Sequence, residues 1–284
     1  MKRLLSLILA TAICLGLTIS SSAVGENQYV EPSLELPDAP ATVPIPPEHR
    51  KVISEGMGID LFKEVPDDLV VPKASLTTMK PKYDQRMVRL VIKFAGASGT
   101  YYGTGFMIGP DAVATAAHNF NHPTYGKATS ITCCVGVGSG INAVYSETIT
   151  NTSRFHRPSQ WDSSKNYRYD YGVIKLSKDV TSVGYFGFGV YNDSILSSNT
   201  FTLMGYGTQG YPSAATSRLS NIGTYDFYYS IDTRGGDSGG PVFFENGKVA
   251  GIHNYGAAPP DYPLPSATRI TTEVFNNMKA WKYQ

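Results

Sequence analysis

The sequence predicts an all-β protein built as barrels or sandwiches, and two observations carry this prediction. From residue 86 onward, short runs rich in β-branched and aromatic residues alternate with Gly, Pro, Asn and Ser, which is typical of these folds. Only the last segment, TTEVFNNMKAWKY (271–283), has a helical apolar face, with Thr271 or Thr272 as its N-cap. The 284 residues are 42% hydrophobic and 17% charged, which suits a soluble globular protein of one or two domains.

The N-terminus has the pattern of a secretory signal peptide. Lys2 and Arg3 precede an apolar run from Leu4 to Ile19, and small residues follow as far as Ala23, so we expect cleavage near Ala23. The run is too short, and too soon followed by polar residues, to indicate a membrane anchor. We therefore expect residues 1–23 to direct a secreted, extracellular protein that has no membrane association once the signal is removed.

Residues 24–70 are predicted to be an acidic propeptide. They carry a net charge of −7, against +6 for residues 71–284, and six prolines lie between residues 31 and 50. Such a segment has little that could pack into a core. We expect it to end between residues 65 and 80, where an activating protease would cut; the alternative is a flexible acidic tail that is not processed.

Nine strands are expected in the body of the chain because each run is short, apolar and bounded by turn residues. They are MVRLVIKF (87–94), GTGFMIG (103–109), AVATAAH (112–118), SITCCVGV (130–137), YGVIKL (171–176), TFTLMGYG (200–207), YDFYYSI (225–231), PVFF (241–244) and KVAGIH (248–253). Asn246-Gly247 separates the last two, which is a strong hairpin signal.

Cysteine usage predicts neither disulfides nor a metal site. Apart from Cys14 in the predicted signal peptide, the chain has only the adjacent pair Cys133 and Cys134, which could close only a strained ring. No further ligands stand at zinc-like spacing, so we expect no metal and no cofactor. The modest positive charge does not support nucleic-acid binding, and we expect a monomer.

Three motifs suggest nucleophilic catalysis, in the order His, Asp, Ser. TAAH ends at His118, YDYG contains Asp170, and GGDSGGP contains Ser238. A serine hydroxyl needs an imidazole to take its proton, and that imidazole needs a carboxylate to orient it. The glycines before Ser238 would let the amides of Gly236 and Ser238 turn toward one developing oxyanion.

These motifs resemble those of the chymotrypsin-like serine proteases, through TAAH and GDSGGP. More narrowly, the chain resembles the bacterial glutamyl endopeptidases in GFMIGPDAVATAAH, SQWDSSKNYRYDYGVIKLS, SVGYFGF and TRITTEVFNNMKAW, over roughly residues 85 to 284. The resemblance implies two perpendicular six-stranded antiparallel β-barrels and a C-terminal α-helix. It places the first barrel in residues 71–180 with His118 and Asp170, and the second in residues 181–284 with Ser238.

Two departures from the family pattern stand out. The cysteines that clamp the loop around the catalytic histidine in many relatives correspond here to Gly103 and Asn119, so packing must hold this loop. Asp237 stands just before Ser238, where many relatives have Asn or Gln. The wider family implies that Asp237 pairs with a newly released amino terminus, and pairing with an internal Arg is the alternative.

Two signals compete for the choice of substrate. Asp232 lies six residues before Ser238, the spacing of the aspartate that selects Lys or Arg in trypsin-like members. In glutamate-specific relatives, a histidine matching His253 and a hydroxyl matching Thr233 face the substrate carboxylate, which needs donors of this kind. We expect Thr233, His253, Asn254, Tyr255 and Gly256 to bind substrate and favour Glu, with Lys/Arg cleavage or a non-catalytic binding homologue as alternatives.

Overall fold

A computed structural model describes residues 51–52, 59–60, 76–257 and 264–284 of the chain. The predicted signal peptide and most of the predicted propeptide lie outside the described residues. Within the leader, β1 (Lys51–Val52) and β2 (Ile59–Asp60) form a short antiparallel pair.

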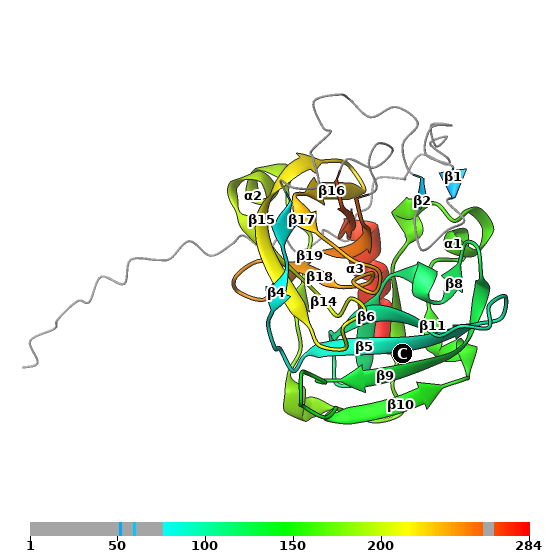
Figure 1. Cartoon of the computed structure of the whole chain (residues 1–284). Helices are drawn as coiled ribbons and strands as arrows, with labels where there is room; N and C mark the ends of the chain where they lie inside the picture. The colour runs from blue at the N-terminus through cyan, green and yellow to red at the C-terminus, as the bar shows by residue number, and fades with distance from the viewer. Residues whose placement is uncertain (1–50, 53–58, 61–75, 258–263) are drawn as a thin grey trace, which may run out of the picture.

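Two curved antiparallel sheets make up the body, which confirms the all-β prediction; they form separate halves of the molecule, cyan to green and yellow to orange in Figure 1. The first contains, in spatial order, β10 (Tyr145–Ile149), β9 (Gly126–Val135), β5 (Met87–Phe94), β6 (Tyr101–Met107), β7 (Ala112–Thr115), β12 (Gly172–Lys175) and β11 (Phe155–His156), with β8 (Asn121–His122) paired to β9.

The first sheet is a half-barrel rather than a closed six-stranded barrel. Its edge strands are β10 and β11, and no pairing joins them in the described part of the chain. The segment between them forms the 3₁₀ turn η5 (Thr152–Arg154), whose capping bonds are local, and β11 has only two residues. This connection therefore offers no strand long enough to complete the ladder.

The second sheet closes on itself with six strands. These are β19 (Lys248–Tyr255), β18 (Pro241–Phe243), β14 (Thr200–Gly205), β15 (Ser213–Ile222), β16 (Asp226–Tyr229) and β20 (Ser266–Arg269), and pairing of β20 with β19 completes the ring. The short β13 (Gly187–Phe188) runs parallel to β19. Each sheet has its own apolar core. Burial alternates along β5, whose buried side chains join the core of the first sheet, and is nearly continuous along β19 in the second.

The segment before the first barrel belongs to the second one. β3 (Thr77–Thr78) pairs with β17 (Ile231–Asp232), and β4 (Lys80–Pro81) pairs with β15. This corrects the expected division of the chain at this end, because the range 71–180 was assigned to the first barrel. Backbone hydrogen bonds hold this segment against the second half of the molecule; in one of them, Thr77 N–H donates to the Ser230 carbonyl at 2.9 Å.

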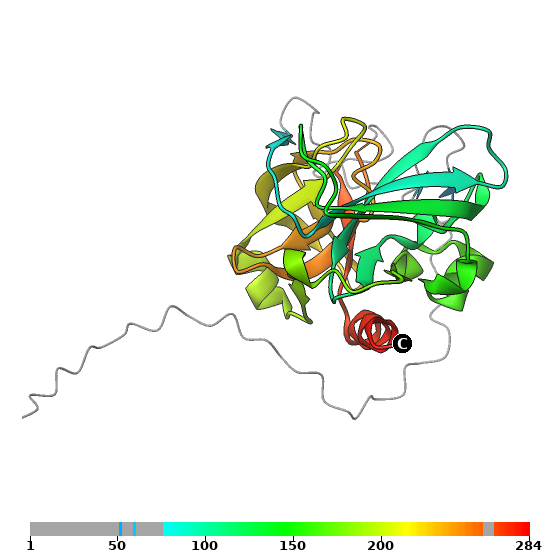
Figure 2. The ribbon, with the colours of Figure 1, turned by 90° about the horizontal axis from the view of Figure 1, so that it is seen from below.

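Helices are short except at the C-terminus. The described α-helices are α1 (Ser159–Ser164), α2 (Asp193–Ser198) and α3 (Thr272–Lys282), with 3₁₀ turns η4 (Ala117–Asn119), η6 (Tyr167–Tyr169) and η7 (Thr181–Val183). Figure 2 shows α3 end-on below the two halves, where its buried Val274 and Met278 join the core between them. The side chain of Thr271 caps α3, as expected. None of the helices in the described ranges is both long and apolar enough to cross a membrane.

Candidate active site

Strand pairing brings His118 to Asp170. β7 and β12 are antiparallel with Thr115 opposite Gly172, so the residues just after β7 lie beside those just before β12. His118 sits in η4, three residues past Thr115, and Asp170 follows η6. Gly172 is required at this crossing, because a Cβ there would overlap the His156 carbonyl and the ring of Phe120.

Asp170 is fully buried and holds His118 by two bonds. Its Oδ2 lies 2.8 Å from His118 Nδ1, and its Oδ1 accepts the His118 backbone N–H at 2.8 Å. Burial acts to raise the pKa of Asp170, but the charge and hydrogen bonds of His118, together with bonds from Tyr255 and Asn254, outweigh it and hold the pKa below its ordinary value. The carboxylate is thus kept ionised beside the imidazole.

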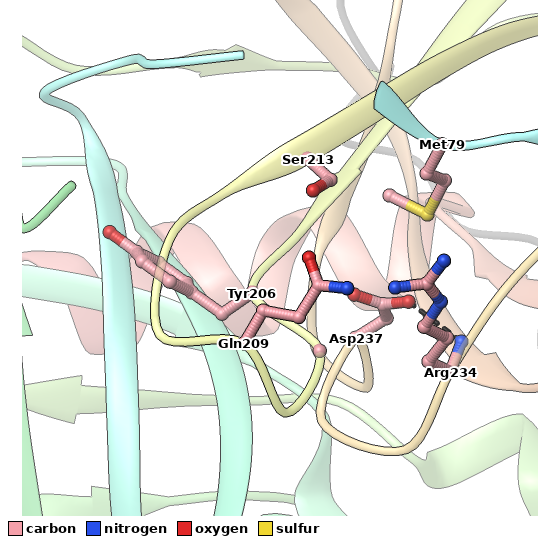
Figure 3. A pocket seen from close by; sticks show the side chains of 7 residues that line it. Met79, Tyr206, Gln209, Ser213, Arg234 and Asp237 are labelled. Carbon is pink, nitrogen blue, oxygen red and sulfur yellow. Dashed lines mark hydrogen bonds between the residues drawn. The ribbon is translucent and has the colours of Figure 1, made fainter. Parts of the chain in front are cut away.

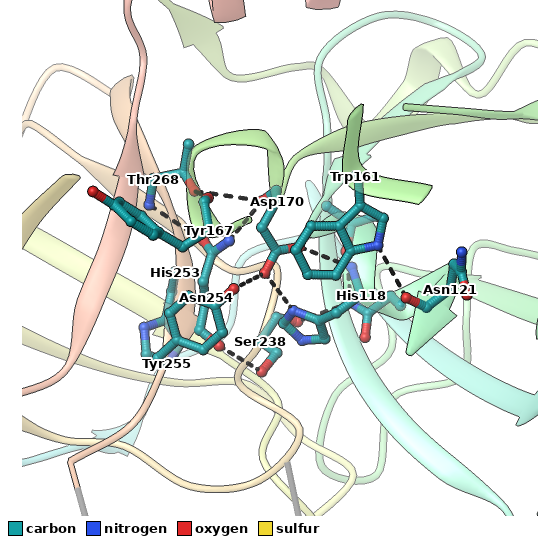
Figure 4. Close-up of polar contacts among 12 residues, drawn as sticks. His118, Asn121, Trp161, Tyr167, Asp170, Ser238, His253, Asn254, Tyr255 and Thr268 are labelled. Carbon is teal, nitrogen blue, oxygen red and sulfur yellow. Dashed lines mark hydrogen bonds and ion pairs between the residues drawn. The ribbon is translucent and has the colours of Figure 1, made fainter. Parts of the chain in front are cut away.

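Asn254 and Tyr255 direct their side chains at Asp170. The Tyr255 hydroxyl donates to Asp170 Oδ2 at 2.6 Å, and Asn254 Nδ2 donates to the Asp170 backbone carbonyl at 2.6 Å (Figure 4). We predicted both residues to bind substrate, and this support of Asp170 was missed. No local pattern signals it, because 84 and 85 positions separate the partners.

Ser238 reaches the same network from the second barrel. Its Oγ donates to the Asn254 backbone carbonyl at 3.2 Å. His118 Nε2, the ring nitrogen away from Asp170, is buried and has no hydrogen-bond partner among the described residues. Asn254 bonds to both Asp170 and Ser238, and Asp170 bonds to His118, so the three members of the predicted triad lie in one hydrogen-bond network (Figure 4). His118 Nε2 is left open for a proton.

Glycine allows the turn that carries Ser238. Gly236 and Gly239 have φ of +97° and +91°, which L side chains rarely adopt. Beyond the turn, Gly239 N–H donates to the His253 carbonyl at 2.6 Å and His253 N–H to the Gly240 carbonyl at 2.8 Å. Within the described ranges, no hydrogen bond uses the N–H of Gly236 or of Ser238, the two amides predicted to face an oxyanion.

Asp237 lines a small pocket, which also has Met79, Tyr206, Gly207, Gln209, Ser213 and Arg234 in its wall (Figure 3). Its Oδ2 accepts the Arg234 backbone N–H at 2.8 Å. Burial raises the pKa of Asp237 to about 6, although bonds from the backbones of Arg234 and Gly207 oppose the rise.

The predicted specificity residues lie on strand β19 and in the segments that directly follow β17 and β19. His253 on β19 is buried, and its Nδ1 lies 2.6 Å from the Tyr229 hydroxyl and 3.1 Å from the Ser266 carbonyl. Burial lowers the pKa of His253 to about 3. Thr233 Oγ1 is buried with no hydrogen-bond partner in the described part of the chain, and a Cβ on Gly256 would lie 3.0 Å from it. Asp232, the trypsin-like candidate, is half-buried at the end of β17.

Comparison with known proteins identifies the family. A family model described as a trypsin-like peptidase domain matches residues 103–252. A Bacillus licheniformis glutamyl endopeptidase is 34% identical over 213 residues, which cover 68% of this chain and 63% of that protein. A Bacillus subtilis protein named extracellular metalloprotease is 34% identical over 205 residues, 69% of this chain and 63% of that protein. The chain thus spans less than two thirds of each relative.

The name of the second relative implies a metal, but the residues here do not fit one: in the described ranges, no three or more His, Cys, Asp or Glu side chains group to hold an ion.

A solved structure of a Glu endopeptidase shares the fold with a TM-score of 0.59 and 23% identity, and the match covers 78% of this chain and 96% of that one. The chain belongs to the trypsin-like peptidase family, has the chymotrypsin fold and is related to the glutamyl endopeptidases.

Proposed function

We propose that the protein is a secreted endopeptidase that hydrolyses peptide bonds through an acyl-enzyme, with Ser238 as nucleophile, His118 as general base and Asp170 as the group that orients His118. The observation that carries this proposal is the 2.8 Å contact of His118 Nδ1 with buried Asp170, which leaves Nε2 without a hydrogen-bond partner in the described part of the chain. Asn254 links Asp170 and Ser238 into the same hydrogen-bond network (Figure 4). An imidazole held in this way presents an unprotonated Nε2 to a hydroxyl.

In the proposed mechanism, Ser238 Oγ attacks the substrate carbonyl while His118 Nε2 takes its proton. The tetrahedral oxyanion accepts hydrogen bonds from Gly236 N–H and Ser238 N–H. His118 then gives the proton to the leaving amine, and a water molecule, activated by the same nitrogen, releases the acyl group. For attack, the Ser238 hydroxyl must turn from the Asn254 carbonyl toward His118, which frees that carbonyl for a substrate N–H.

We propose a preference for Glu, with Asp less favoured, on the acyl side of the cleaved bond. Thr233 Oγ1 supports this, because a buried hydroxyl without a partner is costly and a carboxylate would satisfy it. His253 is the second candidate donor. With its pKa lowered to about 3, the free imidazole is neutral at pH 7, so it would offer an N–H or gain a proton as a carboxylate arrives.

Synthetic peptides test this assignment directly. The expected result is cleavage of a peptide library after Glu, complete loss of cleavage in Ser238→Ala, and labelling of the wild type by an organophosphonate. Cuts after Lys or Arg would instead support the trypsin-like alternative through Asp232. A wild type that neither cleaves nor reacts with the organophosphonate would indicate a non-catalytic binding homologue.

Secretion and processing complete the proposal. The signal-like residues 1–23 and the relative named as extracellular support export, and the acidic leader 24–70 supports a propeptide removed by an activating protease. Met79 lies between the paired strands β3 and β4, inside the range 65–80 expected for the cut, and lines the Asp237 pocket, which supports a cut near this pocket. N-terminal sequencing of the exported protein is the test, and a start at residue 24 in the active form would contradict processing.

A further inference from the structure

We propose that Thr104, on strand β6 of the first barrel, is a positioning residue that sets the direction of the oxyanion-binding amides; this inference rests on the proposed function. Thr104 is fully buried. Its N–H donates to the Ser238 carbonyl at 2.8 Å, and its hydroxyl donates to the Gly236 carbonyl at 2.7 Å. One residue of the first barrel therefore holds the carbonyls of both residues whose amides would face the oxyanion.

Thr104 supplies one of the hydrogen bonds that hold each of two peptide units in the Ser238 loop. In the unit from Gly236 to Asp237, Thr104 Oγ1 binds the carbonyl, and the Asp237 N–H donates to the Arg234 carbonyl at 3.0 Å. In the unit from Ser238 to Gly239, Thr104 N–H binds the carbonyl, and the Gly239 N–H donates to the His253 carbonyl at 2.6 Å.

A peptide unit is planar, so bonds at both of its ends fix its orientation. The Ser238 N–H belongs to the one unit between these two fixed units, and its direction is set from both sides. The Gly236 N–H lies just before the first fixed unit, so its direction is restrained only by the fixed unit that follows it. Both amides lack a hydrogen-bond partner in the described part of the chain. The Asp237 carbonyl, in the same unit as the Ser238 N–H, also accepts the Gly240 N–H at 2.9 Å, so this turn bond and the bonds of Thr104 together hold the Ser238 amide ready for an incoming oxygen.

The rotation of the Thr104 hydroxyl is itself fixed. Its oxygen accepts the Tyr206 N–H at 2.9 Å while its proton goes to the Gly236 carbonyl. Thr115 Oγ1 in turn donates to the Thr104 carbonyl at 2.7 Å. A hydroxyl with both a donor and an acceptor in place cannot turn without losing one bond, which suits a positioning role.

Asn119 adds a second bond to the same carbonyl of Ser238. Its Nδ2 donates to Ser238 O at 3.2 Å and to Thr115 Oγ1 at 2.9 Å. Its side chain fills the space beside Gly103, where a Cβ would lie 2.8 Å from Nδ2. At the two positions where many relatives are expected to have a disulfide, this chain therefore has a hydrogen-bonded link from the His118 turn to the Ser238 loop.

Replacement of Thr104 by a residue of the same shape tests this inference. Thr104→Val removes the hydroxyl, and Thr104→Ser keeps it. Thr132→Val is the matched control, because it removes an equivalent hydroxyl whose 2.8 Å bond to Thr148 lies on the exposed surface of the same barrel. For each purified protein, kcat and KM on a Glu peptide and the affinity for a peptide boronic acid, which forms a tetrahedral adduct, would be measured together with thermal unfolding.

The expected result is a selective loss of transition-state stabilisation. In Thr104→Val, kcat should fall by about tenfold or more with little change in KM, since removal of an oxyanion donor itself costs roughly 10²–10³. Boronate affinity should fall in parallel with kcat/KM. Thr104→Ser should recover most of kcat, and Thr132→Val should match the wild type.

Several outcomes would overturn the inference. A folded Thr104→Val with unchanged kcat would do so, as would a Thr104→Ser as impaired as the valine variant, because the loss would then come from packing. If Thr104→Val does not fold, Asn119→Ala should give the same kcat-selective loss at smaller size, and equal effects on kcat and KM would contradict the inference. Inactivity of both the wild type and Thr132→Val would instead overturn the proposed function, and this inference with it.

Discussion

The hydroxyl of Tyr255 donates to Oδ2 of Asp170 at 2.6 Å, the same oxygen that contacts His118 Nδ1. The Tyr255 ring also lies 6.1 Å from the His118 ring, centroid to centroid. A single tyrosine of the second barrel therefore supports both members of the pair supplied by the first barrel. The two barrels meet at this carboxylate.

Tyr255→Phe keeps the ring and removes one hydrogen bond from the carboxylate. A bond to a charged group contributes about 1.5–3 kcal/mol, so we expect kcat/KM to fall by roughly tenfold and the pKa of Asp170 to rise. Steady-state kinetics on a Glu peptide measure the effect. Tyr283→Phe, at an exposed position, is the control, and equal rates for the two variants would contradict a role for the hydroxyl.

Thr233→Val should separate stability from specificity. It removes a buried hydroxyl that has no partner in the described structure, so the free protein should be no less stable. A substrate carboxylate would lose a donor worth about 1–3 kcal/mol, giving a loss of roughly tenfold or more in kcat/KM for Glu. The measurement compares matched Glu and Gln peptides, and Thr202→Val, in a surface threonine pair of the same barrel, is the control. A Glu/Gln ratio that stays at the wild-type value would exclude Thr233 from the pocket.

Asp237→Asn should change how stability depends on pH. The folded protein holds the Asp237 proton up to about pH 6, whereas an ordinary aspartate releases it near 3.8. The ionised carboxylate therefore destabilises the fold; this cost is absent below pH 3.8, grows toward pH 6 and is constant above. Relative to the wild type, the variant should gain up to about 3 kcal/mol across this window. Urea unfolding at a series of pH values measures the gain, and Asp179→Asn, at an exposed site, should show none.

Gly239→Ala and Gly140→Ala form a matched pair, since both glycines have positive φ, +91° and +67°. A Cβ on Gly239 would overlap the Thr104 carbonyl and Thr115 Oγ1, whereas nothing lies within 4 Å of one on Gly140. We expect Gly140→Ala to cost roughly 1–2 kcal/mol from backbone strain alone. Gly239→Ala should cost more than about 4 kcal/mol or prevent folding. Similar urea midpoints for the two would show that the contact between the barrels is softer than these distances imply.

Local pattern was enough to predict much of the fold. β5 matches the predicted 87–94 at both ends, because alternating apolar residues and flanking turns define it. In contrast, β15 (Ser213–Ile222) was missed: it is mostly Ser, Ala, Thr and Asn, and Ala215 is its only buried residue. This strand is held by pairing with β14, β16 and β4, which no window of its own sequence can reveal.

For the site, sequence motifs predicted which residues would gather but not how the supporting side chains turn. The structure places His118, Asp170 and Ser238 together, and these stand in recognisable motifs. Asn254 and Tyr255 were expected to bind substrate, and no motif indicated that their side chains also bond to Asp170. The direction of these side chains depends on how β19 packs against the first barrel, and this packing joins residues that are far apart in the sequence.

Asn119 beside Gly103 also bears on the redox conditions under which the protein can fold. Cys133 and Cys134 are both free; as neighbours on β9 they point to opposite faces of the sheet, and burial raises the pKa of the Cys133 thiol, which keeps it inert. The loop around His118 is joined to Ser238 by amide and hydroxyl groups, which reductants do not cleave. We therefore expect the folded body to form without an oxidant or a disulfide isomerase, and to keep its geometry in millimolar thiol.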